Sequence, residues 1–191
     1  MRICVYGASS NAIDAWFLAA GELLGQEMAK RGHGLVFGGG AHGMMGATAR
    51  GASAYGGEII GIAPSFFNVD GVLYEHCTQF HYTETMRERK QMMEDYADAF
   101  IMTAGGIGTF EEFFEILTLK QLGRHNKPIA ILNTQHYYDP MEKMLEDAVA
   151  RQFMKESARK LYGIFDTPAA VLQYLEEYSE TARDVSDYKN L

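Results

Sequence analysis

Short apolar runs alternate along the chain with longer stretches whose apolar residues recur at helical spacing. The runs that predict strands lie at residues 3–6, 35–37, 58–63, 99–103, 128–132 and 162–165. The stretches that predict helices lie at residues 12–31, 43–55, 84–96, 108–122, 139–152 and 167–178. Strands that alternate with helices are typical of βαβ units. The pattern therefore predicts an α/β protein with a parallel sheet and helices on both faces.

The pattern is weakest at residues 64–80, where we expect a loop or short turn and then a strand near residues 79–82. No internal repeat, low-complexity tract or linker divides the sequence. We therefore expect a single domain over residues 1–178. The polar end of the sequence, residues 179–191, is expected to fray or to pack against a neighbouring subunit.

Composition narrows the classes of partner. The chain has 191 residues, of which 47% are hydrophobic and 22% charged, as in an ordinary globular protein. A net charge of −8 argues against binding to nucleic acid, which needs a basic surface. Cys4 and Cys77 form no disulfide framework, the start does not resemble a signal peptide, and no apolar run approaches the roughly 20 residues that span a bilayer. We expect a cytoplasmic protein with neither membrane nor nucleic acid as partner.

The most informative stretch is Thr103–Glu112, with the sequence TAGGIGTFEE, which leads from an apolar strand into a helix through a glycine-rich turn. Glycines allow backbone N–H groups to approach an anion, and a helix N-terminus adds unpaired donors. Glu112 follows Thr109 by about one turn, so the two side chains share a helix face. Glu111 points about 100° away around the helix, and we rank it below Glu112. The stretch predicts a phosphate cradle beside a carboxylate.

A second glycine cluster, Phe37–Gly46, also follows a strand and opens a helix. Its Gly39 and Gly40 are candidates to line a ligand site, because ligands of open α/β sheets bind at the carboxyl ends of the strands. Turn geometry alone explains one such cluster, whereas two favour a ligand. Neither cluster has the dinucleotide fingerprint or the lysine of a P-loop, which weakens nicotinamide and nucleoside triphosphate interpretations.

A third group lies on the helix predicted between the two clusters. Helical spacing places Met86, Arg89, Lys90 and Met93 on a shared side. Two core methionines beside a solvated basic edge would explain this group if it stood alone. In an acidic chain a site becomes the better interpretation, because Arg can grip phosphate or ribose and Met packs against a flat base.

Other polar residues carry less weight. The histidines are dispersed, and no nucleophile motif recruits one of them. Ser9 and Ser10 fit either a phosphate contact or a cap of the following helix. No Cys/His cluster has zinc-like spacing. We expect neither a metal nor a cofactor.

Together these segments resemble the Lonely Guy family of cytokinin-activating phosphoribohydrolases. Its hallmarks are a PGGxGTxxE motif, an upstream GGGxxGxMG turn and an intervening M-x-x-R-K helix, and all three have counterparts here in the same order as in the family. The likeness extends from Ile3 to Asp139. It implies a Rossmann-like fold, usually a homodimer, that hydrolyses the N-glycosidic bond of a nucleoside 5′-monophosphate. The implied substrates are cytokinin riboside monophosphate and AMP, and the products are the free base and ribose 5-phosphate.

The resemblance also implies roles for single residues. Arg89 and Glu112 match the catalytic positions of the family. From the resemblance and the patterns together, the substrate-binding candidates are Gly39, Gly40, Met86, Lys90, Gly105, Gly106, Ile107, Gly108, Thr109, Glu111 and Thr118.

Some positions depart from the family pattern. Ala104 stands where the motif has proline, and His136 replaces a glycine before the pair Tyr137-Tyr138. Asp70 is the nearest candidate for an acidic substrate contact found in some relatives. These departures bear on base specificity more than on the type of reaction.

The expected chemistry is stabilisation of an oxocarbenium-like sugar by Glu112, with the phosphate as anchor. The alternative is a carrier of a phosphorylated pterin or nucleotide cofactor on the same fold, which would bind without hydrolysis. DNA handling conflicts with the acidic charge. Some related sequences carry a lysine decarboxylase label, and we set it aside because no lysine lies in a recognisable pyridoxal-phosphate context.

Overall fold

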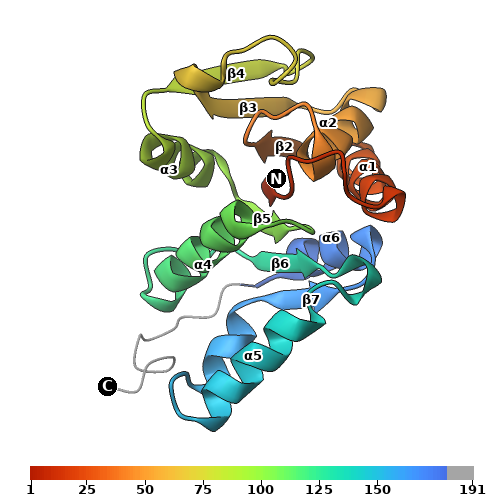
Figure 1. The fold of residues 1–191 in the computed structure, drawn as a ribbon. Coiled ribbons are helices and arrows are strands. Elements are labelled where there is room, and N and C mark those ends of the chain that lie inside the picture. Colours follow the sequence, from red (N-terminus) through yellow and green to blue (C-terminus); the bar gives the residue numbers. More distant parts are fainter. Residues whose placement is uncertain (180–191) are drawn as a thin grey trace.

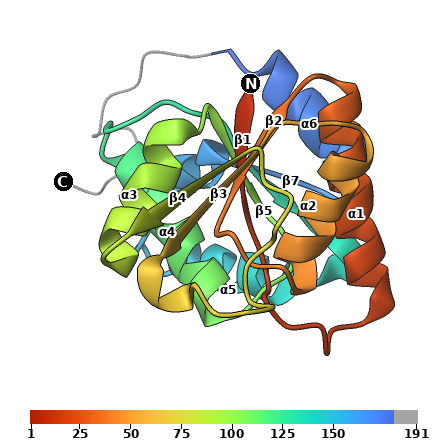
Figure 2. The same ribbon diagram turned by 90° about the horizontal axis from the view of Figure 1, so that it is seen from above.

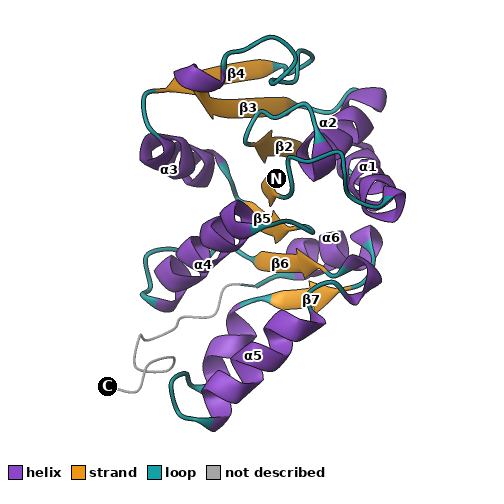
Figure 3. Cartoon of the chain, in the orientation of Figure 1, coloured by secondary structure: helices purple, strands orange, loops and turns teal. Residues whose placement is uncertain are grey.

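The computed structural model describes residues 1–179 of the chain, so most of the expected polar tail lies outside the described residues. A seven-stranded sheet forms the centre, with the order β4-β3-β2-β1-β5-β6-β7 and every neighbouring pair parallel. Figures 1 and 3 show this twisted sheet edge-on between its helices. The strands are β1 (Arg2–Tyr6), β2 (Gly34–Phe37), β3 (Ile59–Pro64), β4 (Gln79–Thr83), β5 (Ala99–Met102), β6 (Ile129–Leu132) and β7 (Gly163–Phe165).

The helices cover both faces of the sheet. The six α-helices of the described part are α1 (Ala15–Lys30), α2 (Gly43–Ala54), α3 (Met86–Tyr96), α4 (Ile107–Gln121), α5 (Asp139–Ala150) and α6 (Pro168–Glu177). Alternate residues of β1 explain the two layers: Ile3 and Val5 pack with α1, α2 and α6, whereas Cys4 and Tyr6 pack with α3, α4 and α5. Figure 2, from above, shows α1, α2 and α6 on one side of the sheet and α3 and α4 on the other.

The order of the strands reverses beside β1. The chain moves outward from β1 through β2 and β3 to β4, and then returns to place β5 against the other edge of β1. β1 pairs with β2 from Arg2 to Val5 and with β5 from Ile3 to Tyr6. In open parallel sheets such a switch point leaves a crevice at the carboxyl ends of the two strands. The loops after β1 and β5 meet there.

The predicted fold class is confirmed, and each predicted strand and helix has a counterpart in the structure. The start of the first helix was wrong: α1 begins at Ala15, because the Asp14 side chain accepts the Trp16 N–H at 3.0 Å. Ser10 instead accepts the N–H of Ala12, within the loop. The 3₁₀ helix at Glu156–Leu161 was not predicted, since its apolar residues are too few to show a period.

Candidate active site

A pocket of about 630 Å³ lies at the carboxyl ends of β1, β2 and β5, at the switch point of the sheet. Loops that follow these strands form its walls, and α3 contributes one side. The predicted candidates that line it are Gly40, Met86, Arg89, Gly106, Ile107, Gly108, Thr109, Glu111 and Glu112. The structure therefore brings the three sequence motifs into one cavity.

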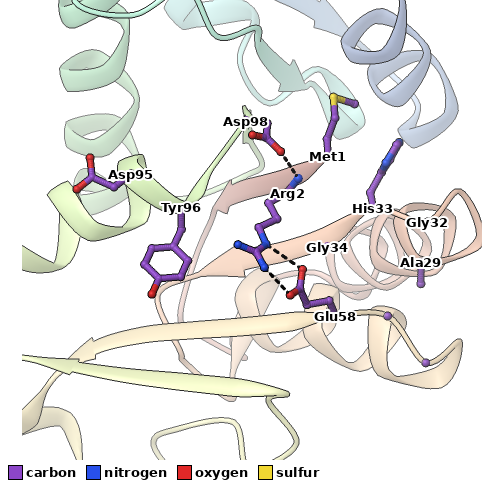
Figure 4. A pocket seen from close by; sticks show the side chains of 12 residues that line it. Met1, Arg2, Ala29, Gly32, His33, Gly34, Glu58, Asp95, Tyr96 and Asp98 are labelled. Atoms are coloured by element: carbon purple, nitrogen blue, oxygen red, sulfur yellow. Dashed lines mark hydrogen bonds and ion pairs between the residues drawn. The ribbon is translucent and has the colours of Figure 1, made fainter.

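A second pocket, of about 850 Å³, lies at the opposite end of the sheet, where β1 and β2 begin (Figure 4). Its Arg2 guanidinium is already engaged by Glu58, with hydrogen bonds of 3.0 and 2.9 Å. The backbone N–H of Arg2 donates to Asp98 in the same pocket. None of the site candidates lines this cavity, so we take the pocket at the switch point as the candidate active site.

The turn between β5 and α4 supplies hydrogen-bond donors to the site. Gly106 is the N-cap of α4 and has no side chain, so no cap occupies the end of this helix. No oxygen of residues 1–179 accepts a hydrogen bond from the N–H groups of residues 106–109. These groups lie at the positive end of a 15-residue helix and open onto the pocket. Such an end is a ready binding site for phosphate.

The N-terminus of α2, in the second glycine cluster, differs in this respect. Its first N–H, that of Gly43, donates to the Asn11 side chain at 2.8 Å, and the Met45 N–H donates to the Ala8 carbonyl at 3.4 Å. The N–H groups of Gly43 and Met45 at the start of α2 are therefore already bonded to the loop after β1. The cradle for an anion is at α4, and the Gly38–Gly40 turn forms the facing wall.

The reason for having glycine, with no side chain, differs between positions in the two turns. A Cβ on Gly38 would overlap the Arg89 guanidinium, whose Cζ lies 2.9 Å from that position. A Cβ on Gly105 would overlap the Thr109 side chain, with 2.6 Å to its Cβ. At Gly106 and Gly108 a Cβ would meet no atom within 4 Å. The last two glycines thus leave open space on the pocket side of the turn.

Arg89 and Glu112 form a buried ion pair at the base of the pocket. The Arg89 Nη1 donates to Glu112 Oε1 at 3.1 Å, and the two residues are only 7% and 9% exposed. The Arg89 Nε also donates to the carbonyl of Ile62, within β3, at 3.3 Å. Arg89 is thereby fixed between the sheet and α4, and it orients the carboxylate.

Burial raises the pKa of the Glu112 carboxyl above its ordinary value. The neighbouring Arg89 charge lowers the pKa, and the Glu111 carboxylate raises it again. A carboxyl group whose pKa is raised holds a proton more readily than an exposed one, and the charge of Arg89 opposes this effect of burial. Such a group can accept a proton from water or stabilise a nearby cation.

Lys90 does not line the pocket. Its ammonium group forms ion pairs with Glu111 and, at 2.8 Å, with Glu115, both on α4. Lys90 therefore ties α3 to α4 beside the pocket, and its partner Glu111 lines the cavity. The sequence could not reveal this, because the pairing joins two helices far apart in the chain.

The other predicted residues fall in several places. Met86 is half-exposed at the pocket wall, whereas Met93 packs in the core. Gly39, which has a φ of +75° and packs against Phe80, and Gly105 are buried behind the lining. Thr118 is exposed further along α4, away from the pocket.

Sequence reasoning missed an apolar part of the wall. Phe67 and Val72, in the segment after β3, face the pocket together with Met86 and the 89% exposed Ile107. The segment also carries an isolated bridge between Gly40 and Leu73, which holds it against the second glycine turn. Asp70, the candidate acidic contact, is exposed in the same segment but does not line the pocket. A lone Phe-Phe pair in an irregular loop gives no period that would have revealed this wall.

No group of three or more His, Cys, Asp or Glu in the described part of the chain is arranged to hold a metal ion. No described helix is long and apolar enough to cross a bilayer. The fold and the pocket together define a Rossmann-like α/β protein with an anion cradle and a buried acid–arginine pair at its switch point.

Comparison with known proteins identifies the family. The cytokinin riboside 5′-monophosphate phosphoribohydrolase LOG of Oryza sativa subsp. japonica is 38% identical over 177 residues, which cover 93% of this chain and 73% of that protein. LOG2 of Arabidopsis thaliana, of the same name, is 35% identical over 177 residues, with coverages of 93% and 83%. The chain belongs to this family, the Lonely Guy phosphoribohydrolases, as its motifs predicted.

A family model described as "Possible lysine decarboxylase" also matches residues 45–175. No lysine is among the described residues that line the pocket. Among solved structures, the molybdenum cofactor binding protein from Rippkaea orientalis superposes with a TM-score of 0.71 at 21% identity, covering 92% of this chain and 94% of that chain. The Moco carrier protein from Chlamydomonas reinhardtii gives 0.68 at 23% identity, with coverages of 93% and 98%. These structures share the fold.

Proposed function

We propose that this protein hydrolyses the N-glycosidic bond of a nucleoside 5′-monophosphate, releasing the base and ribose 5-phosphate. The observation that carries the proposal is the buried Arg89–Glu112 pair in the same pocket as the unpaired N–H groups of residues 106–109. One feature recognises a phosphate, and the other offers a fixed negative charge to the sugar. The relatives named as phosphoribohydrolases support the same reaction.

The phosphate is the anchor of the substrate. Its oxygens accept hydrogen bonds from residues 106–109 at the start of α4, where the helix dipole favours a negative charge. Binding energy from this remote group then orients the sugar toward Glu112. A nucleoside without phosphate is therefore a much poorer substrate.

Glu112 acts at the sugar. The bond between C1′ and the base nitrogen breaks, and its electron pair leaves with the base, so the ribose takes on oxocarbenium character. The carboxylate stabilises that positive charge and accepts a proton from the water that adds to C1′. The departing base takes up one proton from solvent, and Glu112 later returns the proton of the water to solvent, so the net reaction consumes one water molecule and leaves its hydroxyl on C1′. Arg89 holds the carboxylate in place through the 3.1 Å hydrogen bond.

The apolar wall fits the base. Phe67, Val72, Met86 and Ile107 line the pocket with apolar side chains, which pack against a flat heterocycle and an attached hydrocarbon group. Both AMP and a cytokinin riboside monophosphate, as in the names of the relatives, suit such a wall.

The test is direct. The protein is incubated with AMP and with isopentenyladenosine monophosphate, and free base and ribose 5-phosphate are quantified. Glu112→Gln should abolish release of base while nucleotide binding persists, Arg89→Ala should be strongly impaired, and Glu111→Gln should be milder. Equal turnover by the wild type and Glu112→Gln would sink the proposal. A tightly held pterin that copurifies with an inactive wild-type protein would instead favour a carrier.

We further infer that the protein acts as a cytoplasmic homodimer and does not bind nucleic acid. The net charge of −8 opposes a nucleic-acid partner, and exposed apolar residues such as Ile107, Phe66 and Phe67 near the pocket mouth offer contact area to a second copy. Analytical ultracentrifugation at several concentrations tests the assembly. A species of 21.3 kDa at every concentration would contradict it.

A further inference from the structure

We propose that Tyr137 and Tyr138, in the loop between β6 and α5, are positioning residues that aim the backbone donors of the phosphate cradle. The proposal rests on the proposed function, because it names how the same cradle is oriented. Neither hydroxyl belongs to the lining of the pocket. Both act on the far side of the β5–α4 turn.

The two tyrosines hold carbonyl groups of the turn. The Tyr138 hydroxyl donates to the Thr103 carbonyl at 2.7 Å, and the Tyr137 hydroxyl donates to the Gly105 carbonyl at 2.8 Å. The carbonyl between them, that of Ala104, accepts the N–H of Ala8 at 3.0 Å. Three successive carbonyls of the turn therefore each have a specific donor.

These bonds determine where the N–H groups point. The peptide bonds of the turn are trans, and in a trans peptide the carbonyl of one residue and the N–H of the next point in opposite directions. A donor that fixes the Gly105 carbonyl behind the turn thereby directs the Gly106 N–H away from that donor. No oxygen of the described residues accepts this N–H, and Gly106 lines the pocket. Tyr137 thus presents a donor to the cavity without touching a ligand.

The loop that carries the tyrosines is itself held firmly. The buried Asn133 side chain accepts the Tyr138 N–H and donates to Asp139, both at 2.8 Å. The Tyr137 ring packs edge-on against Phe17 of α1, with ring centroids 5.8 Å apart. The rings therefore have fixed places before any ligand arrives.

Backbone strain accompanies this arrangement. Gln135 and His136 have φ values of +55° and +57°, in the left-handed region that side chains other than glycine rarely adopt. Strain of this kind persists only where the surroundings enforce it, and it often occurs at functional sites. Here the two residues turn the chain back so that both hydroxyls reach the β5–α4 turn.

The experiment separates phosphate binding from base binding. Tyr137→Phe keeps the ring and removes the hydroxyl. Tyr82→Phe is the matched control, since its exposed hydroxyl donates to Asn68 at 3.3 Å and neither residue lines the pocket. Calorimetry measures the Kd for ribose 5-phosphate and for adenosine. We expect Tyr137→Phe to raise the Kd for ribose 5-phosphate roughly fivefold to tenfold, because one oriented donor is lost. The Kd for adenosine should stay within about twofold of the wild-type value. Tyr82→Phe should change neither.

A second readout follows the turn without any ligand. In ¹⁵N-labelled protein the Gly106 amide resonance should shift in Tyr137→Phe and not in Tyr82→Phe. Tyr138→Phe, which releases the Thr103 carbonyl, serves as an independent variant should Tyr137→Phe fold poorly. Equal loss of affinity for ribose 5-phosphate and adenosine, or no change in either, would overturn the proposal.

The outcomes also distinguish this proposal from the proposed function. A wild-type protein that cleaves AMP while Tyr137→Phe and Tyr138→Phe bind ribose 5-phosphate normally would retain the function and reject the positioning role. A wild-type protein that cleaves no nucleotide but loses ribose 5-phosphate affinity in Tyr137→Phe would reject the function and retain the cradle. A wild-type protein that does not bind ribose 5-phosphate would reject both.

Discussion

At the scale of single residues, the glycines of the two turns form two groups. Some are required by close packing within the protein, and others leave space that only a ligand would use. A side chain at Gly38 or Gly105 would clash with Arg89 or Thr109, respectively. Gly106 and Gly108 have neither a close neighbour nor a positive φ. Close approach of a ligand to the backbone remains as the physical reason for glycine at these two positions.

Gly108→Ala should combine normal stability with weaker substrate binding. Alanine favours a helix, so the free energy of unfolding should stay unchanged or rise by about 0.5 kcal/mol. The added methyl group fills space beside the cradle, so the KM for AMP should rise roughly tenfold or more. Urea denaturation and steady-state kinetics measure the two effects, with the exposed helical substitution Ser53→Ala as control. Normal kinetics in Gly108→Ala would show that no ligand approaches this backbone.

The charge of Glu111 predicts a shift in the pH profile. Its carboxylate raises the pKa of Glu112, whereas Lys90 lowers it. Glu111→Gln removes a negative charge and releases Lys90 from one partner, and both changes favour the ionised form of Glu112. The acidic limb of kcat/KM, where activity is lost as Glu112 takes up a proton, should therefore move to lower pH.

The control for this shift is Glu115→Gln. Glu115 also pairs with Lys90, but it is not among the main charges that shift the pKa of Glu112. Glu115→Gln therefore releases Lys90 from one partner and leaves the Glu111 charge in place, so its acidic limb should move less than that of Glu111→Gln. The phosphate of the substrate titrates near pH 6 in all variants and so cancels in the comparison. A limb that moves to higher pH in Glu111→Gln would mean that a different group controls the activity.

Much of the residue-level site was open to prediction. Glycine, arginine and glutamate in short motifs announce phosphate binding by their chemistry, so Arg89, Glu112 and the cradle were visible in the sequence. The partner of Lys90 and the contribution of Phe67 were not, because each depends on a segment distant in the chain.

At the scale of elements, local signals fix where the site helices begin. α3 starts with a capping box in which the Thr85 hydroxyl accepts the Glu88 N–H at 3.2 Å and the Glu88 carboxylate accepts the Thr85 N–H at 3.1 Å. Arg89 follows directly after Glu88, so the capping box fixes where Arg89 lies along the helix relative to the sheet. α4 begins without any such cap, and its open end faces the pocket. The two starts serve different purposes: one holds a side chain, and the other presents backbone.

The β6–α5 loop yields a prediction about stability. His136 has a φ of +57° and a largely exposed side chain whose nearest ion-pair partner, Asp139, is 3.6 Å away. His136→Gly removes the strain of the left-handed conformation, and the flexibility of glycine in the unfolded chain offsets part of the gain. We expect the free energy of unfolding to rise by about 0.5–1 kcal/mol.

Urea denaturation checks this value, with His76→Gly as control. His76 is exposed in a loop and has no positive φ, so the same replacement there should be neutral or destabilising. If His136→Gly destabilises as much as His76→Gly, the strain does not cost what the backbone geometry implies.

At the scale of the whole molecule, the site places a charged pair inside an apolar layer of the core, which costs free energy of folding. Arg89 and Glu112 lie near Cys4 and Tyr6 of the core, which are buried. Removing two charges from water is costly, and their attraction recovers only part of that cost. The pair is explained by chemistry rather than by stability.

A double substitution tests this balance. Arg89→Met combined with Glu112→Leu should leave the free energy of unfolding unchanged or raise it by about 1–4 kcal/mol while abolishing hydrolysis. Arg89→Met alone should be destabilising by about 3 kcal/mol, because it leaves a buried carboxylate without its partner. Urea denaturation measures both.

The matched control is the partly exposed pair at the other end of the sheet. Arg2→Met with Glu58→Leu should retain hydrolysis and change the stability by no more than about 1 kcal/mol, since the pair is 42% and 35% exposed. A double variant at the site that unfolds more easily than Arg89→Met alone would show that the ion pair itself stabilises the fold.

The sequence by itself determined the alternation of strands and helices, the two glycine turns and the identity of the acid and the arginine. These properties follow from local periodicity and from the chemistry of short motifs. Only the tertiary structure decided that residues near 38, 89 and 112 share one pocket, since that depends on β5 returning to the side of β1. It also decided that Tyr137 and Tyr138 hold the carbonyls of the cradle, because hydrogen bonds between distant loops leave no pattern along the chain.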